Sequence, residues 1–262
     1  MKISLIQIDS GDNKEVNFRK SQKYIIDAVA QKADVICLSE NFLYRGSDKE
    51  EEMEKLPSHY VKFFQELAKT KKINIVLGTI ILFTKPGVKP TNTCLIINRE
   101  GEIVHSYDKQ YMYDVERKDV IYRESDFVQP GKNIGFFELD GIKMGVGICI
   151  DLRYPEYFRE LMKKGAEIIF LPSNFRKITG QLAWDILTKA RAIENQVYFC
   201  ACGQTGQSGE KARVGNSRIV SFDGNIISEI GEEEGLVSAE LDLDTLREFR
   251  KEFPVLKQIK QF

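Results

Sequence analysis

The sequence predicts an α/β fold in which helices cover β-sheets. Short apolar runs typical of buried strands alternate with segments of helical periodicity, and hairpin signals lie between them. The 262 residues contain no stretch rich in proline, serine and glycine that would separate two halves. We therefore expect residues 1–262 to form one domain of layered sheets and helices.

The composition excludes several classes of protein. The net charge is −1 with basic and acidic residues interspersed, so we expect no nucleic-acid partner and no charged membrane-binding face. No apolar run approaches the roughly 20 residues that span a bilayer, and the first residues lack the features of a signal peptide. We therefore expect a protein that has no membrane partner.

The cysteine and histidine content bears on compartment and cofactors. The five cysteines are scattered and form no C-x-x-C pair, and only two histidines are present, His59 and His105. Unpaired cysteines favour a reducing compartment, so we expect a cytoplasmic protein without a disulfide framework. The same pattern argues against a zinc site built from cysteine or histidine, and we predict no metal.

In the first half, periodicity and breaker residues predict the order of the elements. The apolar run that ends before Glu40 is continuous, which is typical of a buried parallel strand. Gly101 separates two strand patterns and predicts a hairpin. The charged run 49–55 is expected on a solvated helix or loop. The predicted elements are a strand over 2–8, a helix over 13–31, a strand over 34–39, a helix over 61–71, a strand over 73–82 and paired strands over 93–98 and 102–107.

In the second half, turn residues give the clearest boundaries. Asp-Gly pairs at 140–141 and 223–224 predict hairpin turns. Pro155 suits the first position of a helix, and Gly165 suits its end. The segment 115–131 is expected to be a loop. The other predicted elements are strands over 136–139 and 142–149, a helix over 155–164, a strand over 167–171, a helix over 182–195, a strand over 197–202, a glycine-rich loop over 203–215, strands over 217–222, 226–230 and 236–241, and a helix over 243–250.

An internal similarity links the two halves. Residues 33–42 align with residues 166–175, and five of the ten aligned positions are identical. One interpretation is that two similar halves bring the carboxyl ends of their strands to one cleft. The other is that any helix–strand–turn unit looks like this, and the residues alone leave both open.

Three reactive residues follow predicted strands. Cys149 ends a strand just before a helix N-terminus, which lowers a thiol pKa and favours the nucleophilic thiolate. Glu40 follows a buried strand, and Lys109 follows a hairpin strand. Ligands bind at the ends of strands in α/β sheets, so these side chains are candidates for one cleft. Taken one at a time, each residue has a plainer interpretation. Cys149 could be a buried core cysteine, Glu40 a surface acid, and Lys109 one of the 38 basic residues with no special role.

A cysteine, a glutamate and a lysine form a coherent set for acyl transfer. The carboxylate of Glu40 can take the proton of the thiol and later hand it to a leaving amine. The ammonium of Lys109 favours both the thiolate and a negative tetrahedral intermediate. The backbone N–H of Ile150 is a candidate second donor to the oxyanion.

The ordered set of motifs resembles the nitrilase superfamily of carbon–nitrogen hydrolases along essentially the whole chain. An acid after an apolar strand is matched by residues 38–42, and a lysine after a strand by residues 107–109. The pattern G-x-x-I-C-x-D-x-R-x-P-E is matched by residues 145–156. A second glutamate before a Pro-Gly turn is matched by Glu124, and residues 190–195 also look like the family.

The resemblance implies a fold and a set of roles. The expected fold is a four-layer αββα sandwich with two pseudo-related halves, assembled through helices into a homodimer or a larger homo-oligomer. By resemblance Glu40 is the general base, Lys109 stabilises the intermediate and Cys149 attacks. Glu124 is the second glutamate, which orients the lysine or assists proton transfer. No metal or organic cofactor is implied.

The resemblance looks closest to the omega-amidase-like members, which act on amides of small carboxylic acids. It implies hydrolysis of a small linear amide through a cysteine thioester, with release of ammonia. An N-carbamoyl compound or a nitrile remains an alternative substrate, and a non-catalytic binding protein or a metal-dependent amidohydrolase is an alternative class. The residues expected to contact substrate are Tyr44, Ile150, Asn174, Phe175 and Arg176, with Arg45 and Trp184 in the same stretches. Arg176 is expected to hold a substrate carboxylate.

The sequence departs from the family's pattern at three places. Ser39 stands where a proline usually precedes the glutamate, and Ile150 stands where an aromatic residue often follows the cysteine. Gln110 and Tyr111 follow the lysine, where the second position is usually histidine. No departure removes a reactive group, but together they reshape the pocket.

Overall fold

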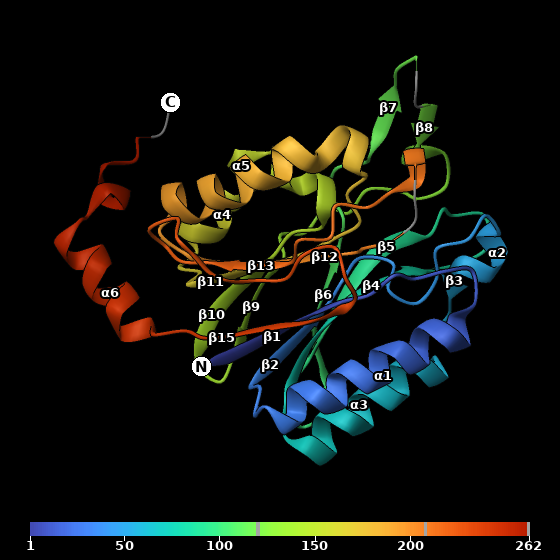
Figure 1. The fold of residues 1–262 in the computed structure, drawn as a ribbon, viewed down its shortest axis with the longest axis horizontal. Helices are drawn as coiled ribbons and strands as arrows, with labels where there is room; N and C mark the ends of the chain where they lie inside the picture. Colours follow the sequence, from blue (N-terminus) through green and yellow to red (C-terminus); the bar gives the residue numbers. More distant parts are fainter. Residues whose placement is uncertain (119–120, 207–208, 261–262) are drawn as a thin grey trace.

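The structure, a computed structural model, describes residues 1–118, 121–206 and 209–260. Two β-sheets pack face to face, and helices cover the outer face of each sheet (Figure 1). Helices α1 and α3 cover one sheet, and helices α4 and α5 cover the other (Figure 1). The four layers are the αββα sandwich that the resemblance implied.

The first sheet contains the N-terminal strands. Its strands lie in the order β15 (Gly235–Glu240), β1 (Lys2–Gln7), β2 (Val35–Leu38), β4 (Asn74–Leu82), β5 (Thr91–Ile97) and β6 (Ile103–Asp108), and the short β3 (Met53–Glu54) also pairs with β4. The helices between these strands are α1 (Lys14–Ala30), the four-residue α2 (Lys49–Glu52) and α3 (His59–Lys71).

The second sheet is built from the middle and the end of the chain. Its strands lie in the order β14 (Ile226–Glu229), β13 (Arg218–Val220), β12 (Tyr198–Gly203), β11 (Ile168–Ser173), β10 (Ile142–Val146) and β9 (Phe136–Leu139). Its helices are α4 (Pro155–Lys163) and α5 (Lys177–Asn195). Helix α6 (Leu243–Glu252) lies at the edge of the sandwich (Figure 1), where Arg247 pairs with Glu167 at 2.7 Å.

The two sheets repeat one pattern of pairing. From β15 to β6, successive pairs are antiparallel, parallel, parallel, antiparallel and antiparallel. The same series runs from β9 to β14. Strands β2 and β11, which carry the similar segments 33–42 and 166–175, occupy equivalent places in the two series. The internal similarity therefore marks two related halves.

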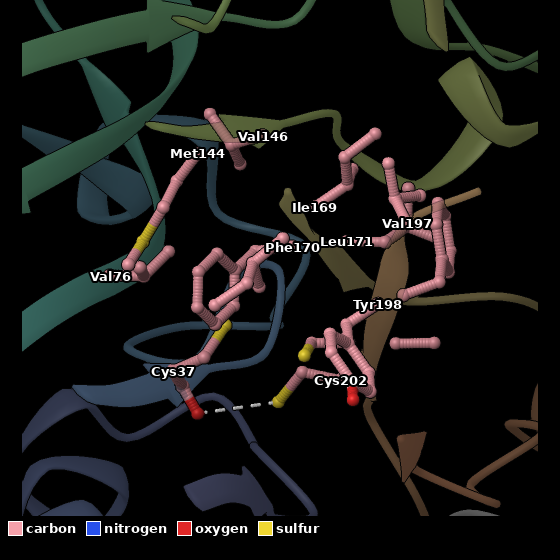
Figure 2. Packing of buried hydrophobic residues seen from close by; sticks show 14 of the residues in the cluster. Cys37, Val76, Met144, Val146, Ile169, Phe170, Leu171, Val197, Tyr198 and Cys202 are labelled. Atoms are coloured by element: carbon pink, nitrogen blue, oxygen red, sulfur yellow. Dashed lines mark hydrogen bonds between the residues drawn. The ribbon is translucent and has the colours of Figure 1, made fainter. Parts of the chain in front are cut away.

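Strands of the first sheet are apolar on both faces because one face packs in the core between the sheets and the other packs beneath the helices. In β2, Val35 and Cys37 face the other sheet, while Ile36 and Leu38 join the core beneath α1 and α3. Figure 2 shows Phe170 of β11 within the inter-sheet core near Cys37 and Val76.

The structure differs most clearly from the sequence prediction at three places. The segment expected as a loop over 115–131 contains a small hairpin of β7 (Asp114–Glu116) and β8 (Ile121–Arg123), followed by a 3₁₀ turn over Glu124–Asp126. Its strands have three residues each, too few to show a period of two. Helix α5 begins at Lys177, whereas its predicted start was residue 182. The prediction was late because the first turn of the helix carries little apolar periodicity. Strand β10 ends at Val146, before the cysteine, because Cys149 opens a 3₁₀ helix over Cys149–Arg153.

Across the described ranges, no helix combines the length and the apolar character needed to cross a bilayer.

Candidate active site

The ends of four strands meet around one cavity of about 520 Å³. Glu40 follows β2, Lys109 follows β6, Cys149 comes after β10 and Asn174 follows β11. The three reactive residues predicted from the sequence, together with Glu124, therefore line a common space. The other lining residues are Gly11, Asp12, Asn41, Arg45, Gly46, Ser47, Lys49, Glu52, Tyr113, Tyr122, Ile150, Phe175, Arg176, Lys211 and Arg213.

Lys109 lies at the centre of a buried charge cluster. Its Nζ is 2.9 Å from Glu40 Oε1 and 2.8 Å from Glu124 Oε2, and the side chain is almost fully buried. Burial lowers the pKa of the Lys109 ammonium, but the charges of Glu124 and Glu40 outweigh this and hold that pKa well above its ordinary value. The lysine therefore stays charged at neutral pH.

Asn92 of β5 connects the two glutamates and was not found from the sequence. Its Nδ2 donates to Glu40 Oε1 at 2.9 Å and to Glu124 Oε1 at 3.3 Å. Glu124 also accepts from the backbone N–H of Tyr113 at 2.7 Å. A signal was present, because polar residues interrupt an otherwise apolar strand over 91–93.

The turn that carries Glu40 is fixed by backbone contacts. Gln204 donates from Nε2 to the Glu40 carbonyl oxygen at 2.9 Å, and the N–H of Asn41 donates to Thr79 Oγ1 at 2.9 Å. Asn41 has a φ of 53°. A Cβ at Gly78 would collide with the Ser39 carbonyl oxygen, so only glycine allows β4 to approach this turn.

Cys149 sits on a sharp turn of the backbone. Its φ is 49°, in the left-handed region that a residue with a side chain rarely adopts. Burial, followed by the charge of Glu40, raises the thiol pKa well above its ordinary value, while Lys109 and a hydrogen bond from the Asn174 backbone act in the opposite direction. The net shift of this pKa is therefore opposite in direction to the lowering expected from a helix N-terminus, because burial and the glutamate dominate.

Asp151 supports the cysteine turn from behind. Its carboxylate accepts from the Ile148 N–H at 2.7 Å, from Tyr107 Oη at 2.7 Å and from the Tyr111 N–H at 3.2 Å. These bonds tie the turn to β6, the strand that leads to Lys109. Burial raises the pKa of Asp151 to about 6.

Four of the five residues expected to contact substrate line the cavity: Ile150, Asn174, Phe175 and Arg176. Tyr44 does not line it. The Tyr44 ring is buried and its hydroxyl lies against Gly46, so the main chain at Gly46, rather than the tyrosine, faces the cavity.

Trp184, expected near the rim, is instead fully buried behind the cavity wall. Its indole ring packs against Phe175 at 5.5 Å between centroids, and its Nε1 donates to the Asn216 carbonyl oxygen at 2.9 Å. The tryptophan therefore supports a lining residue from behind.

Two arginines make one side of the cavity cationic. Arg176 lies 5.3 Å above the ring of Tyr122, and Arg213, missed in the sequence, donates to Asn174 Oδ1. Burial, then the charges of Arg45 and Arg176, lower the pKa of Arg213 to about 10. Within the described residues, neither Arg176 nor Arg213 forms an ion pair with a carboxylate, so both are available to an anionic ligand.

No trio of histidine, cysteine, aspartate or glutamate side chains among the described residues is arranged to hold a metal ion. A buried thiol beside a carboxylate and an ammonium is a set of groups that can cleave an acyl bond. Fold and site together thus describe a hydrolase of the αββα sandwich class.

Comparison with known proteins gives the family. Residues 2–251 match the model of the carbon–nitrogen hydrolase family, and the chain belongs to that family. It is 31% identical over 261 residues to a zebrafish (Danio rerio) protein named omega-amidase NIT2, covering 98% of this chain and 94% of the relative.

Solved structures agree with this assignment. The chain superimposes with a TM-score of 0.88 and 30% identity on Nit3 of Saccharomyces cerevisiae, described as a member of branch 10 of the nitrilase superfamily, covering 98% of this chain and 96% of that one. The TM-score to the Caenorhabditis elegans NitFhit protein is 0.90 at 31% identity. There the match covers 99% of this chain but only 65% of the longer NitFhit chain.

The buried carboxyl of Asp151 predicts a pH dependence of stability. Its pKa is raised in the folded state from 3.8 to about 6, so the folded state binds the proton more tightly than the unfolded state. Its contribution to stability therefore falls as pH rises from about 4 to about 6, by about 3 kcal/mol in total. We expect the wild-type free energy of unfolding minus that of Asp151→Asn to fall by this amount, measured by urea denaturation at each pH. A difference that does not vary over this range would contradict the assignment.

Proposed function

We propose that this protein hydrolyses a small linear amide of a carboxylic acid through a thioester on Cys149, releasing ammonia. The observation that carries the proposal is the meeting of the thiol with Glu40 and Lys109 in one cavity. No cofactor is needed, because the three side chains supply the nucleophile, the base and the cation.

The first half of the reaction forms the acyl-enzyme. The raised pKa keeps the Cys149 thiol protonated at rest, so Glu40 takes this proton as the sulfur attacks the amide carbonyl carbon. Lys109 and the N–H of Ile150 stabilise the oxyanion. The carbon–nitrogen bond breaks, and Glu40 passes the proton to the departing nitrogen, which leaves as ammonia.

The second half regenerates the enzyme. Glu40 takes a proton from a water molecule that attacks the thioester carbon, and the carbon–sulfur bond breaks. The carboxylic acid leaves, and the proton returns to Cys149. Glu124 holds the Lys109 ammonium in place through both steps, at 2.8 and 2.9 Å from its two carboxylate oxygens.

The arginines favour an amide whose acyl part carries a carboxylate. Arg176 and Arg213 line the cavity beside Cys149, and guanidinium groups pair well with carboxylates. The name of the zebrafish relative, omega-amidase, agrees with an amide substrate. If the protein hydrolysed an N-carbamoyl compound or a nitrile in preference to the amide, that compound class would be its substrate instead. If it hydrolysed none of them, it would be a binding protein.

We also propose that two copies of this one-domain chain associate through α5. On this helix Leu182, Ile186 and Ile193 are at least half exposed, with side chains on one face. Such an apolar stripe on a covering helix is suited to burial against a second copy. The five free cysteines agree with a cytoplasmic location.

Cys149 is predicted to be the reactive thiol. It lines the cavity, whereas Cys94 is fully buried in the core. We expect iodoacetamide at neutral pH to modify Cys149 first, read by peptide mass spectrometry. Cys149→Ala should lower amide turnover at least about a thousandfold, while Cys200→Ala, a core control, should stay active. Labelling of Cys149 no faster than Cys94, or turnover by Cys149→Ala, would contradict the mechanism.

Arg176 is predicted to recognise the acyl carboxylate. Arg176→Ala should raise the KM for the monoamide of a short dicarboxylic acid about 10- to 100-fold, the cost of losing a charged hydrogen bond. The KM for a neutral aliphatic amide should change little. Lys177→Ala is the matched control, because Lys177 pairs with Glu232 and does not line the cavity. Equal effects on both amides would argue against a carboxylate at Arg176.

Charge placed on the α5 stripe is predicted to break the dimer. Leu182→Asp combined with Ile186→Asp should convert a dimer into a monomer in sedimentation equilibrium, because each carboxylate would be desolvated in the contact. Ile26→Asp on α1, also exposed, serves as the control. A wild-type protein that is monomeric at micromolar concentration would overturn this part of the proposal.

A further inference from the structure

The side chain of Asn92 belongs to a hydrogen-bond network around the two buried glutamates, and the mechanism above gives it no part. A carboxylate offers about two acceptor sites on each oxygen, so the two glutamates together offer about eight. Among the described residues, six hydrogen bonds from Lys109, Asn92 and the backbone N–H of Tyr113 end on these oxygens. The distribution of these six bonds separates the roles of the two carboxylates.

The carboxylate of Glu124 is saturated with donors. Its Oε1 accepts from Lys109 Nζ at 2.9 Å and from Asn92 Nδ2 at 3.3 Å. Its Oε2 accepts from Lys109 Nζ at 2.8 Å and from the Tyr113 N–H at 2.7 Å. Two donors on each oxygen leave no acceptor site for a proton in transit. This arrangement suits Glu124 to orienting the lysine and not to carrying a proton.

The carboxylate of Glu40 is occupied on one oxygen only. Lys109 Nζ and Asn92 Nδ2 both donate to Oε1, each at 2.9 Å. In the described part of the chain, no N–H group donates to Oε2. Burial, the charge of Glu40 and a hydrogen bond between the thiol and the Glu40 side chain all raise the pKa of Cys149. The thiol and the free oxygen of this carboxylate are therefore the groups that can exchange a proton.

The amide of Asn92 is held with its N–H groups toward the carboxylates. Its backbone carbonyl accepts from the Lys109 N–H at 2.9 Å, which fixes β5 against the start of the lysine segment. The reverse orientation of the amide would set Oδ1 against two negative charges. In the observed orientation Oδ1 is buried and has no partner among the described residues, which costs stability. The contribution of Asn92 to the site therefore comes from its two N–H groups.

We propose that Asn92 is a positioning residue that confines proton transfer to Oε2 of Glu40. The inference rests on the proposed function. Asn92 and Lys109 fill the acceptor sites of Oε1 and stop the carboxylate from rotating, so Oε2 stays free and faces the reacting groups. The proton moves from Cys149 Sγ to Glu40 Oε2 as the sulfur–carbon bond forms. It then moves from Oε2 to the amide nitrogen as the carbon–nitrogen bond breaks.

The test removes both N–H donors at nearly constant side-chain size with Asn92→Leu. We expect kcat for the monoamide of a short dicarboxylic acid to fall about 10- to 100-fold, while KM changes less than about twofold, because substrate contacts are untouched. The acid limb of the kcat/KM profile should move to higher pH by at least about half a unit, because a carboxylate that loses a donor is protonated more readily. Turnover is measured from about pH 4 to about pH 9 and divided by the Cys149 thiol that iodoacetamide titrates.

Asn74→Leu is the matched control. Asn74 is also a fully buried asparagine that donates to a carboxylate, Asp140 Oδ2 at 2.7 Å, and it does not line the cavity. This variant should lower the free energy of unfolding in urea but keep the wild-type kcat per titrated thiol and the wild-type acid limb. A purely structural effect of losing a buried amide would therefore appear in both variants.

Asn92→Ser keeps one hydroxyl donor and decides the question if Asn92→Leu does not fold. Its kcat and its acid limb should lie between those of wild type and the values expected for Asn92→Leu. An acid limb that stays at the wild-type pH in a folded Asn92 variant would overturn the inference and leave the proposed function intact. A rise in KM as large as the fall in kcat, or the same changes in Asn74→Leu, would also overturn it. A wild-type protein that hydrolyses no amide would overturn the proposed function and this inference with it.

Discussion

The burial of one ammonium group between two carboxylates is the constraint on which the site depends. An unpaired charge in this position would cost several kcal/mol, because water is excluded and the dielectric is low. Lys109 avoids that cost because Glu40 and Glu124 both reach it. The three residues come from the end of β6, from the turn after β2 and from the 3₁₀ turn after β8, so one electrostatic requirement links three distant segments of the chain.

Much of the fold was predictable because the strong signals are local. Continuous apolar runs predicted β2 and β11, whereas the similarity of residues 33–42 to 166–175 left two interpretations open until the sheet order showed two related halves. The hairpin β7–β8 was missed because strands of three residues carry too little periodicity. The predicted strand continued to Cys149, whereas β10 ends at Val146. The left-handed backbone of Cys149 was not predictable, because cysteine as a residue type shows no preference for that conformation.

The candidate site was predictable where reactive residues follow strands, and less so where its geometry depends on tertiary contacts. Glu40, Lys109 and Cys149 do line one cavity, whereas Asn92 reaches the two glutamates and Arg213 reaches the cavity only through the pairing of strands and loops distant in sequence. Tyr44 shows the reverse error, since an aromatic residue next to a lining position can turn inward. The sequence also could not predict the direction in which the Cys149 pKa shifts, because the largest cause is burial, which only the folded structure shows.

The position of the β7–β8 hairpin has a consequence for the dynamics of the enzyme. The hairpin projects from the sandwich (Figure 1), and the outer residues of both strands are exposed, yet the chain reaches Glu124 directly through it. Local opening of such a segment costs far less than global unfolding, and amide hydrogen exchange detects it. Glu124 could leave Lys109 in such an opening only by breaking a buried ion pair, so that pair itself holds the base of the hairpin against the sandwich.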